Sequence, residues 1–61
     1  MKLRIELKMD NEAFSEYSGS EVGRILRSLA ADYADRDLLP GELAHLRDLN
    51  GNTVGEAHVT E

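Results

Sequence analysis

The chain has 61 residues, no cysteine and a formal net charge of −5 at pH 7. This length allows one domain with a small core, and the lack of cysteine excludes disulfides and thiolate zinc sites as sources of stability. The negative charge repels nucleic-acid phosphates, and no apolar run approaches the ~20 residues of a membrane span. We therefore expect a single cytoplasmic domain, residues 1–61, with no direct contact to nucleic acid or membrane.

Residues 2–9 alternate in polarity without interruption. One face would carry Leu3, Ile5, Leu7 and Met9, and the other Lys2, Arg4, Glu6 and Lys8. A period of two is typical of a half-buried β-strand. Residues 10–19 follow as an acidic connection, in which we expect Phe14 to be buried and a short helical turn to lie within 11–16.

The next segment carries one apolar stripe at helical spacing, formed by Val22, Ile25, Leu26, Leu29 and Tyr33. This spacing predicts an amphipathic α-helix. Ser18 and Glu21 form a capping-box pattern at its start, and Ser20 is the competing N-cap. Gly23 within the stripe predicts a close backbone approach. We expect the helix to end near Asp35–Asp37, because the residue before Pro40 avoids the helical region.

Residues 43–60 are predicted to form a β-hairpin, because Asn50-Gly51 is a strong turn signal. A two-residue type I′ loop would place Leu46 opposite Gly55. A type I turn over residues 48–51 with a bulge would instead place Asp48 opposite Asn52 and Leu46 opposite Val54. We favour the second alternative, because it pairs two apolar residues and puts Asp and Gly where that turn prefers them.

The predicted order is β-α-β-β, an α+β fold in which one helix packs on a three-stranded antiparallel sheet. Only a central third strand makes every pairing antiparallel, given the directions of the chain segments. The expected core consists of Leu3, Ile5, Leu7, Phe14, Val22, Ile25, Leu26, Leu29, Tyr33, Leu46, Val54 and Val59. We expect Leu38 and Leu39 to complete this core, with an exposed apolar patch as the alternative.

The chain lacks the sequence motifs of common catalytic and cofactor sites. Two imidazoles and a carboxylate can bind zinc, but His45 and His58 are not directly opposite each other in either hairpin register. Carboxylates such as Asp32 and Asp35 lack the pocket that acid–base catalysis needs to separate their pKa values. We therefore predict that the protein is not an enzyme and uses no metal and no cofactor.

The acidic residues are the feature of the sequence that points most directly to a function. Seven of them lie in the connections at the helix ends and on the helix flank: Glu12, Glu16, Glu21, Asp32, Asp35, Asp37 and Glu42. In the predicted topology these segments can form one rim, and we expect this rim to bind a partner. A carboxylate array matches a Lys/Arg-rich protein surface, and matching charge steers association. The alternative is a solvated face that keeps a small domain soluble.

Three segments carry a resemblance to a known class of proteins: Lys-Leu-Arg-Ile-Glu-Leu at residues 2–7, Glu-Val-Gly-Arg-Ile-Leu-Arg-Ser-Leu-Ala at 21–30, and Leu-Arg-Asp-Leu-Asn-Gly-Asn-Thr-Val-Gly at 46–55. With them the chain resembles small acidic proteins of bacteriophages and mobile elements. Some proteins of this kind are anti-CRISPRs, and several of those imitate DNA. The resemblance implies an inhibitor that acts in the host bacterial cytoplasm on the basic surface of a CRISPR effector subunit. The alternative is a small structural or regulatory module that forms a homodimer through a strand edge.

Overall fold

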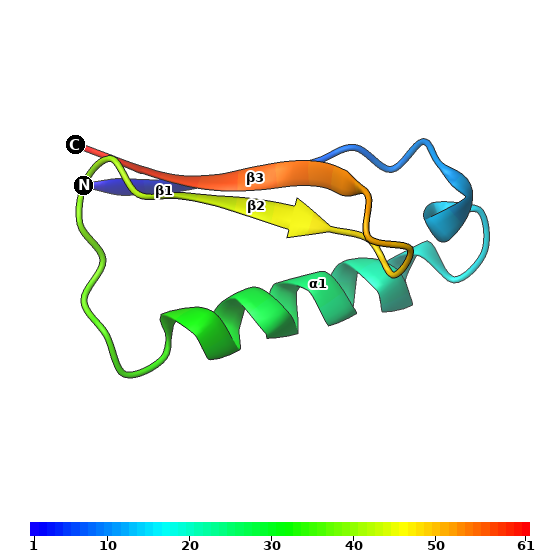
Figure 1. The fold of residues 1–61 in the computed structure, drawn as a ribbon, viewed down its shortest axis with the longest axis horizontal. Coiled ribbons are helices and arrows are strands. Elements are labelled where there is room, and N and C mark those ends of the chain that lie inside the picture. The colour runs from blue at the N-terminus through cyan, green and yellow to red at the C-terminus, as the bar shows by residue number, and fades with distance from the viewer.

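The computed structural model describes all residues of the chain, 1–61. Its elements are β1 (Lys2–Leu7), the 3₁₀-helix η1 (Glu12–Phe14), α1 (Ser18–Tyr33), β2 (Leu43–Arg47) and β3 (Thr53–Thr60). The three strands form one antiparallel sheet in the order β1-β3-β2, so the predicted α+β fold with a central third strand is confirmed. α1 lies against one face of this sheet, and the other face carries no helix (Figure 1).

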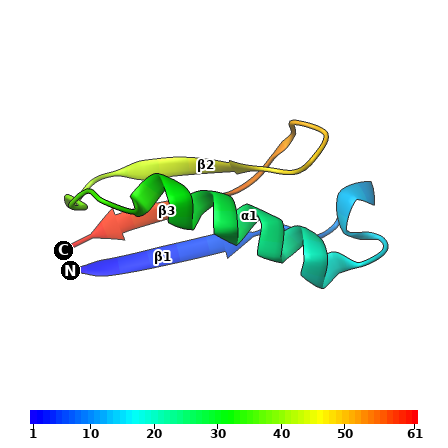
Figure 2. The same cartoon turned by 90° about the horizontal axis from the view of Figure 1, so that it is seen from below.

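The axis of α1 is oblique to the strands. Seen from the helix side, α1 crosses the sheet from the start of β2 toward the far end of β1, which leaves the first half of β1 uncovered (Figure 2). Neither helix combines the length and the apolar character that a membrane span requires.

The core lies between α1, η1 and the hairpin. Its buried apolar residues are Phe14, Ile25, Leu29, Leu46, Val54, Ala57 and Val59, and Leu7, Val22 and Tyr33 pack partly buried beside them. Three expected core residues are exposed instead: Leu3 at 45%, Ile5 at 41% and Leu26 at 39%. The prediction was wrong for Leu3 and Ile5 because the oblique helix covers β3 and β2 but leaves this part of β1 open. It was wrong for Leu26 because this residue lies on the flank of α1 beside the buried Ile25–Leu29 stripe.

The hairpin combines features of both predicted registers. The N–H of Gly51 donates to the carbonyl of Asp48 at 3.1 Å, and the N–H of Asp48 donates to the carbonyl of Asn52 at 2.9 Å, as in the favoured four-residue turn. Leu46 is nevertheless opposite Gly55, so the expected pairing of Leu46 with Val54 is wrong. Val54 is the extra residue of a second bulge, and a bulge can redirect a side chain. Here the side chain of Val54 lies in the core.

The ends of α1 differ from their predicted positions. Ser18 is already the first helical residue, and the N-cap is Tyr17 in a left-handed conformation (φ 55°) that makes no side-chain capping hydrogen bond. The capping-box prediction is therefore wrong, since the Glu21 side chain is used elsewhere. The helix ends at Tyr33, two residues before the expected stretch.

Two further expectations on glycine and leucine residues are corrected by the structure. A Cβ atom at Gly23 would meet only the flexible side chain of Arg27, whereas one at Gly55 would collide with the backbone oxygen of Glu6. The close backbone approach is therefore at Gly55. In the loop after α1, Leu38 is half-buried without packing against the core, and Leu39 is 65% exposed, so the expectation that both complete the core is wrong.

Candidate partner-binding surface

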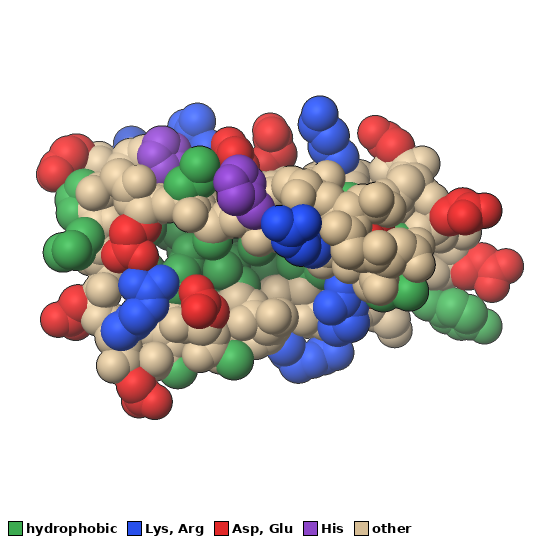
Figure 3. Space-filling view, viewed as in Figure 1, with side chains coloured by type: hydrophobic (Ala, Val, Ile, Leu, Met, Phe, Trp, Pro, Cys, Tyr) green, Lys and Arg blue, Asp and Glu red, His purple; other side chains and the backbone are tan.

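The seven acidic residues do not form a single rim. Glu12 and Glu16 lie at the η1 end of the molecule, whereas Asp32, Asp35, Asp37 and Glu42 lie at or beyond the C-terminal end of α1. The 16 residues of α1 separate the two groups by roughly 24 Å. Figure 3 shows acidic side chains at both ends of this face, with most of its Lys and Arg side chains between them. Residues before and after a straight helix lie at opposite ends of it, so they cannot share one rim.

Glu21 belongs to neither group, because its side chain is buried in the first turn of α1. Its Oε1 accepts from Nε of Arg24 at 2.8 Å, and its Oε2 accepts from Nη2 of Arg24 at 3.0 Å and from the N–H of Leu49 at 2.8 Å. The hydrogen bonds from Arg24 lower the pKa of Glu21, the Leu49 N–H lowers it further, and burial opposes both. Glu21 therefore joins the helix to the β2–β3 turn and is not available to a partner.

The second group, which we name the α1 C-terminal cluster, consists of Asp32, Asp35, Asp37 and Glu42. Arg36 lies within it: its Nη1 donates to Oε1 of Glu42 at 2.7 Å, and its Nη2 lies 3.5 Å from Oδ2 of Asp32. The second carboxylate oxygen of Glu42 accepts from the N–H of Leu39 at 2.7 Å. Arg36 and that N–H both lower the pKa of Glu42. The loop after α1 is thus held by its own charged residues.

Asp35 and Asp37 are exposed and form no ion pair or side-chain hydrogen bond. They follow the C-terminal end of α1, where the carbonyl groups carry partial negative charge. Only part of this charge is compensated, because Nε of Arg36 donates to the carbonyl of Asp32 at 3.2 Å. Basic side chains are favourable at this position, yet the last turn of α1 contains none. Asp35 also adopts a left-handed backbone conformation, with φ 68°. The fold therefore concentrates negative charge here without compensating it fully.

The η1 end carries the other exposed acidic group. Asn11 caps η1, because its Oδ1 accepts from the N–H of Ala13 at 3.0 Å. Glu12 and Glu16 are exposed and form no ion pair, and residues 9–23 contain no Lys or Arg. Glu12 and Glu16 therefore resemble Asp35 and Asp37 in having no intramolecular partner, but they lie near the positive end of the α1 dipole.

Asp48 is a buried charged residue that the prediction placed only as a turn residue. Its Oδ1 accepts from the N–H groups of Asn50 and Asn52, both at 2.9 Å, and its Oδ2 accepts from Nδ2 of Asn11 at 2.8 Å and of Asn52 at 3.2 Å. Burial raises the pKa of Asp48, but the hydrogen bonds from the three asparagines outweigh it and hold the pKa below its usual value.

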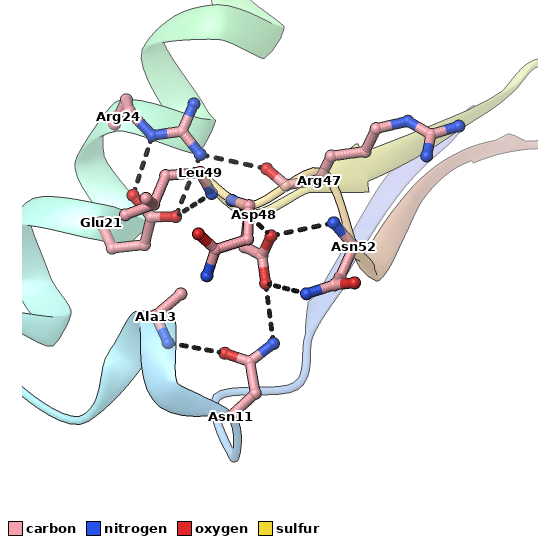
Figure 4. A network of polar contacts seen from close by, with 9 residues as sticks. Asn11, Ala13, Glu21, Arg24, Arg47, Asp48, Leu49 and Asn52 are labelled. Atoms are coloured by element: carbon pink, nitrogen blue, oxygen red, sulfur yellow. Dashed lines mark hydrogen bonds and ion pairs between the residues drawn. The ribbon is translucent and has the colours of Figure 1, made fainter.

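Figure 4 shows how Asp48 and Glu21 form two adjacent networks at one corner of the molecule. Nη2 of Arg24 also donates to the carbonyl of Arg47 at 3.1 Å. In the sequence, the only indication of these networks was Asp48 at the first position of the predicted turn. The contacts to Asn11 and Glu21 span 37 and 28 residues, so local patterns could not reveal them.

The largest concavity is an open groove of about 460 Å³ between α1 and β2, bordered by Arg24, Ser28, Asp32 and Leu46. His45 is opposite Glu56 on the helix-free face of the sheet, and His58 lies two residues further along β3, opposite Leu43. No three His, Asp or Glu side chains converge in a way that could hold a metal ion.

Comparison with protein-family models, with curated proteins and with solved structures finds no match to this chain.

Proposed function

We propose that this chain is a non-enzymatic inhibitor that covers a basic, DNA-binding surface of a host defence complex, as an anti-CRISPR protein of the DNA-mimic type does. The α1 C-terminal cluster makes the contact. The observation that carries this proposal is the pair Asp35 and Asp37, which are exposed and unpaired at the negative end of α1.

The electrostatics of the free protein favour a binding role for these two residues. Neither Asp35 nor Asp37 gains an intramolecular partner, and each adds negative charge to a stretch, residues 28–46, in which Arg36 is the only Lys or Arg. A partner surface rich in Lys and Arg supplies the missing countercharge, and such complementarity raises the association rate as well as the specificity.

The cluster is also pre-ordered. Arg36 bridges Asp32 and Glu42, and its guanidinium lies 5.4 Å from the centre of the Tyr33 ring. Glu42 in turn holds the backbone at Leu39. A loop that is held in place before binding loses less conformational entropy when the complex forms. These contacts support a defined arrangement of carboxylates that can stand in for the phosphates of a DNA strand.

The function itself is tested in bacteria that carry an active CRISPR system and are infected with a phage that the system targets. We expect expression of the chain to restore phage plating against at least one CRISPR type. A tagged chain should recover a subunit of that effector from lysate, and excess duplex DNA should displace it. Unchanged plating across a panel of CRISPR types, or a partner indifferent to DNA, would contradict the proposal.

The contact surface is tested by matched charge reversals at the two ends of the molecule. Asp35→Lys with Asp37→Lys should weaken binding to the recovered subunit by about tenfold or more, about 1.4 kcal/mol. Glu12→Lys with Glu16→Lys exchanges the same number of charges at the η1 end and should change binding much less. Equal losses in the two variants would show that net charge, and not this cluster, determines affinity. The melting temperature of the Glu12/Glu16 variant should stay close to that of the unmodified protein, because both side chains are exposed and unpaired. Asp35→Lys places a lysine in a left-handed conformation (φ 68°) that Asp tolerates better, so some loss of stability is expected and binding is measured well below the melting temperature of that variant.

A further inference from the structure

β1 carries an apolar strip that nothing in the chain covers. Leu3 and Ile5 point to the helix side of the sheet, like their neighbours Val59 and Ala57 on β3, but remain 45% and 41% exposed. Figure 2 shows why, since α1 reaches β1 only at the far end of the strand.

The flank of α1 nearest this strip is also apolar. Arg24 and Ser28 border the groove beside β2. Leu26 lies on the opposite flank of the buried Ile25–Leu29 stripe, so helical geometry places it toward β1. Its 39% exposure adds to the same uncovered surface.

The outer edge of β1 has free backbone groups. The N–H of Lys8 donates to the carbonyl of Val54 at 2.7 Å, which places the N–H groups of the even-numbered residues on the β3 side. Backbone groups alternate between the two edges of an antiparallel strand. The N–H and C=O groups of Leu3, Ile5 and Leu7 therefore point outward, where an edge strand can pair with another chain.

β2 forms the other edge of the sheet but is less suited to pairing. It has five residues, and its register shifts between Leu46 and Arg47, whereas the six-residue pairing of β1 with β3 is regular. Bulges next to an edge twist it away from a flat partner.

We propose that a second copy of this chain pairs with β1 across a two-fold axis at Ile5. The two β1 strands run antiparallel, with Ile5 opposite Ile5 and Leu3 opposite Leu7, and the two sheets join into one of six strands. The outward backbone groups of Leu3, Ile5 and Leu7 become hydrogen-bonded. The axis is perpendicular to the sheet, so both copies of α1 lie on one face and Leu26 of each borders the joined apolar strip.

Charge complementarity selects this occupant and this register. With Ile5 on the axis, Arg4 of each copy lies opposite Glu6 of the other on the helix-free face. These residues form non-hydrogen-bonded pairs, in which facing side chains approach most closely. Moving the axis to Arg4 places Arg4 opposite Arg4 and Lys2 opposite Glu6, and moving it to Glu6 places Glu6 opposite Glu6 and Arg4 opposite Lys8. Each shifted register therefore puts a like-charged pair at the centre of the joined strands, where like charges directly opposite each other destabilise a sheet. In the register centred on Ile5, the like charges of Lys2 and Lys8 oppose each other only at the solvated ends.

Dimerisation would also add buried apolar surface to the small core of the single chain. Only seven apolar residues are buried in the 61-residue monomer, and domains of this size commonly need an additional source of stability such as oligomerisation. The strip of Leu3, Ile5 and Leu26 from two copies supplies further apolar burial on the helix side of the sheet.

The proposal is tested first by mass in solution. We expect sedimentation or light scattering to give twice the monomer mass of 6.8 kDa, and Ile5→Lys to return the protein to a monomer. Leu43→Lys is the matched control, because Leu43 is 49% exposed on the other edge strand. It should leave the dimer intact. A monomeric unmodified protein, or dissociation by Leu43→Lys and not by Ile5→Lys, would overturn the proposal.

The register is tested by exchanging charges. Arg4→Glu alone places a carboxylate opposite Glu6 of the other copy, and Glu6→Arg alone creates facing arginines, so each should weaken the dimer. The double variant restores opposite charges and should recover dimerisation. In the register with Arg4 on the axis, the double variant would still place like charges opposite each other, and dimerisation would not recover. Failure of the double variant to recover would therefore refute the Ile5-centred register.

Amide hydrogen exchange gives a readout that does not depend on any variant. The N–H groups of Leu3 and Ile5 are free in the monomer, so their protection should rise with protein concentration as the dimer forms. Fast exchange of both amides at concentrations where the mass is that of a dimer would show that another surface forms the interface.

Discussion

Gly55 is the residue of β3 at which the backbone of β1 comes too close to leave room for a side chain. It is paired with Leu7 on one side and Leu46 on the other, next to the bulge at Val54. A Cβ atom here would meet the backbone of Glu6 and Leu7, which cannot move without displacing β1. Glycine is needed at this position for the close approach and not for its backbone conformation, since the φ of Gly55 is not positive.

We expect Gly55→Ala to lower the free energy of unfolding by about 2 kcal/mol or more, at the upper part of the usual range for overpacking. Gly19→Ala is the control, because nothing lies within 4 Å of a Cβ at this helical position. It should stabilise the protein by about 0.5–1 kcal/mol through helix propensity. Urea unfolding followed by circular dichroism measures both. A neutral Gly55→Ala would show that β1 can shift away from β3 without cost.

Among the elements, α1 has its weakest point at its start. Tyr17 takes the N-cap position in a left-handed conformation, makes no capping hydrogen bond and is 83% exposed. An L-residue in this conformation costs roughly 1–2 kcal/mol relative to glycine. The helix therefore owes its position to Glu21 and to the packing of Ile25 and Leu29 rather than to its cap.

Tyr17→Gly should raise the free energy of unfolding by about 0.5–1 kcal/mol, because glycine adopts a positive φ without strain but loses more entropy on folding. Ser20→Gly, in the first turn of the same helix, should instead lower it by roughly 0.5 kcal/mol. Thermal unfolding of the two variants separates strain relief from a general effect of glycine. Destabilisation by Tyr17→Gly would mean that the tyrosine ring contributes more than its backbone strain removes.

Across the molecule as a whole, two carboxylates join segments that are distant in sequence, and a third holds a loop in place. Glu21 connects α1 to the hairpin turn, Asp48 connects that turn to the segment before η1, and Glu42 fixes the loop between α1 and β2. The pKa of each lies below its ordinary value of 4.5 for Glu and 3.8 for Asp.

These lowered pKa values predict stability that depends on acid pH. The unfolded chain binds protons more readily at these groups, so their contribution is complete above the ordinary values and is lost as the pH falls through the lower values of the folded state. We expect the urea midpoint to fall steeply below about pH 4.5. Glu21→Gln and Asp48→Asn should each lower stability at neutral pH and flatten the acid decline. Glu16→Gln, whose carboxylate has no partner, should change neither, and an equally steep decline in all variants would contradict this assignment.

The proposed dimer has a consequence for the distribution of charge. Because the two β1 strands run antiparallel, the η1 end of one copy lies at the same end of the six-stranded sheet as the α1 C-terminal cluster of the other. Acidic groups that one chain keeps apart would then share an end of the assembly. The two proposals remain separable, because the mass of the protein does not depend on any partner.

Local patterns in the chain were enough to define the elements and their order. Alternation at residues 2–9, the apolar stripe at 22–33 and the turn at 48–51 were sufficient for a strand, a helix and a hairpin. Chain direction then required β3 to be central, because only that placement makes all pairings antiparallel. Each of these features depends on spacing within a few residues or on the direction of successive segments.

Only the packing of the elements determined which side chains are covered and where the charges lie. Alternation shows that Leu3 and Ile5 share a face, but the oblique crossing of α1 determines that this part of the face is exposed. Glu21 and Asp48 are buried because hydrogen bonds across 28 and 37 residues compensate their desolvation. The length of α1 separates the acidic residues that the sequence had suggested would meet. Burial and the placement of charge depend on how the elements pack against one another, which local sequence patterns do not specify.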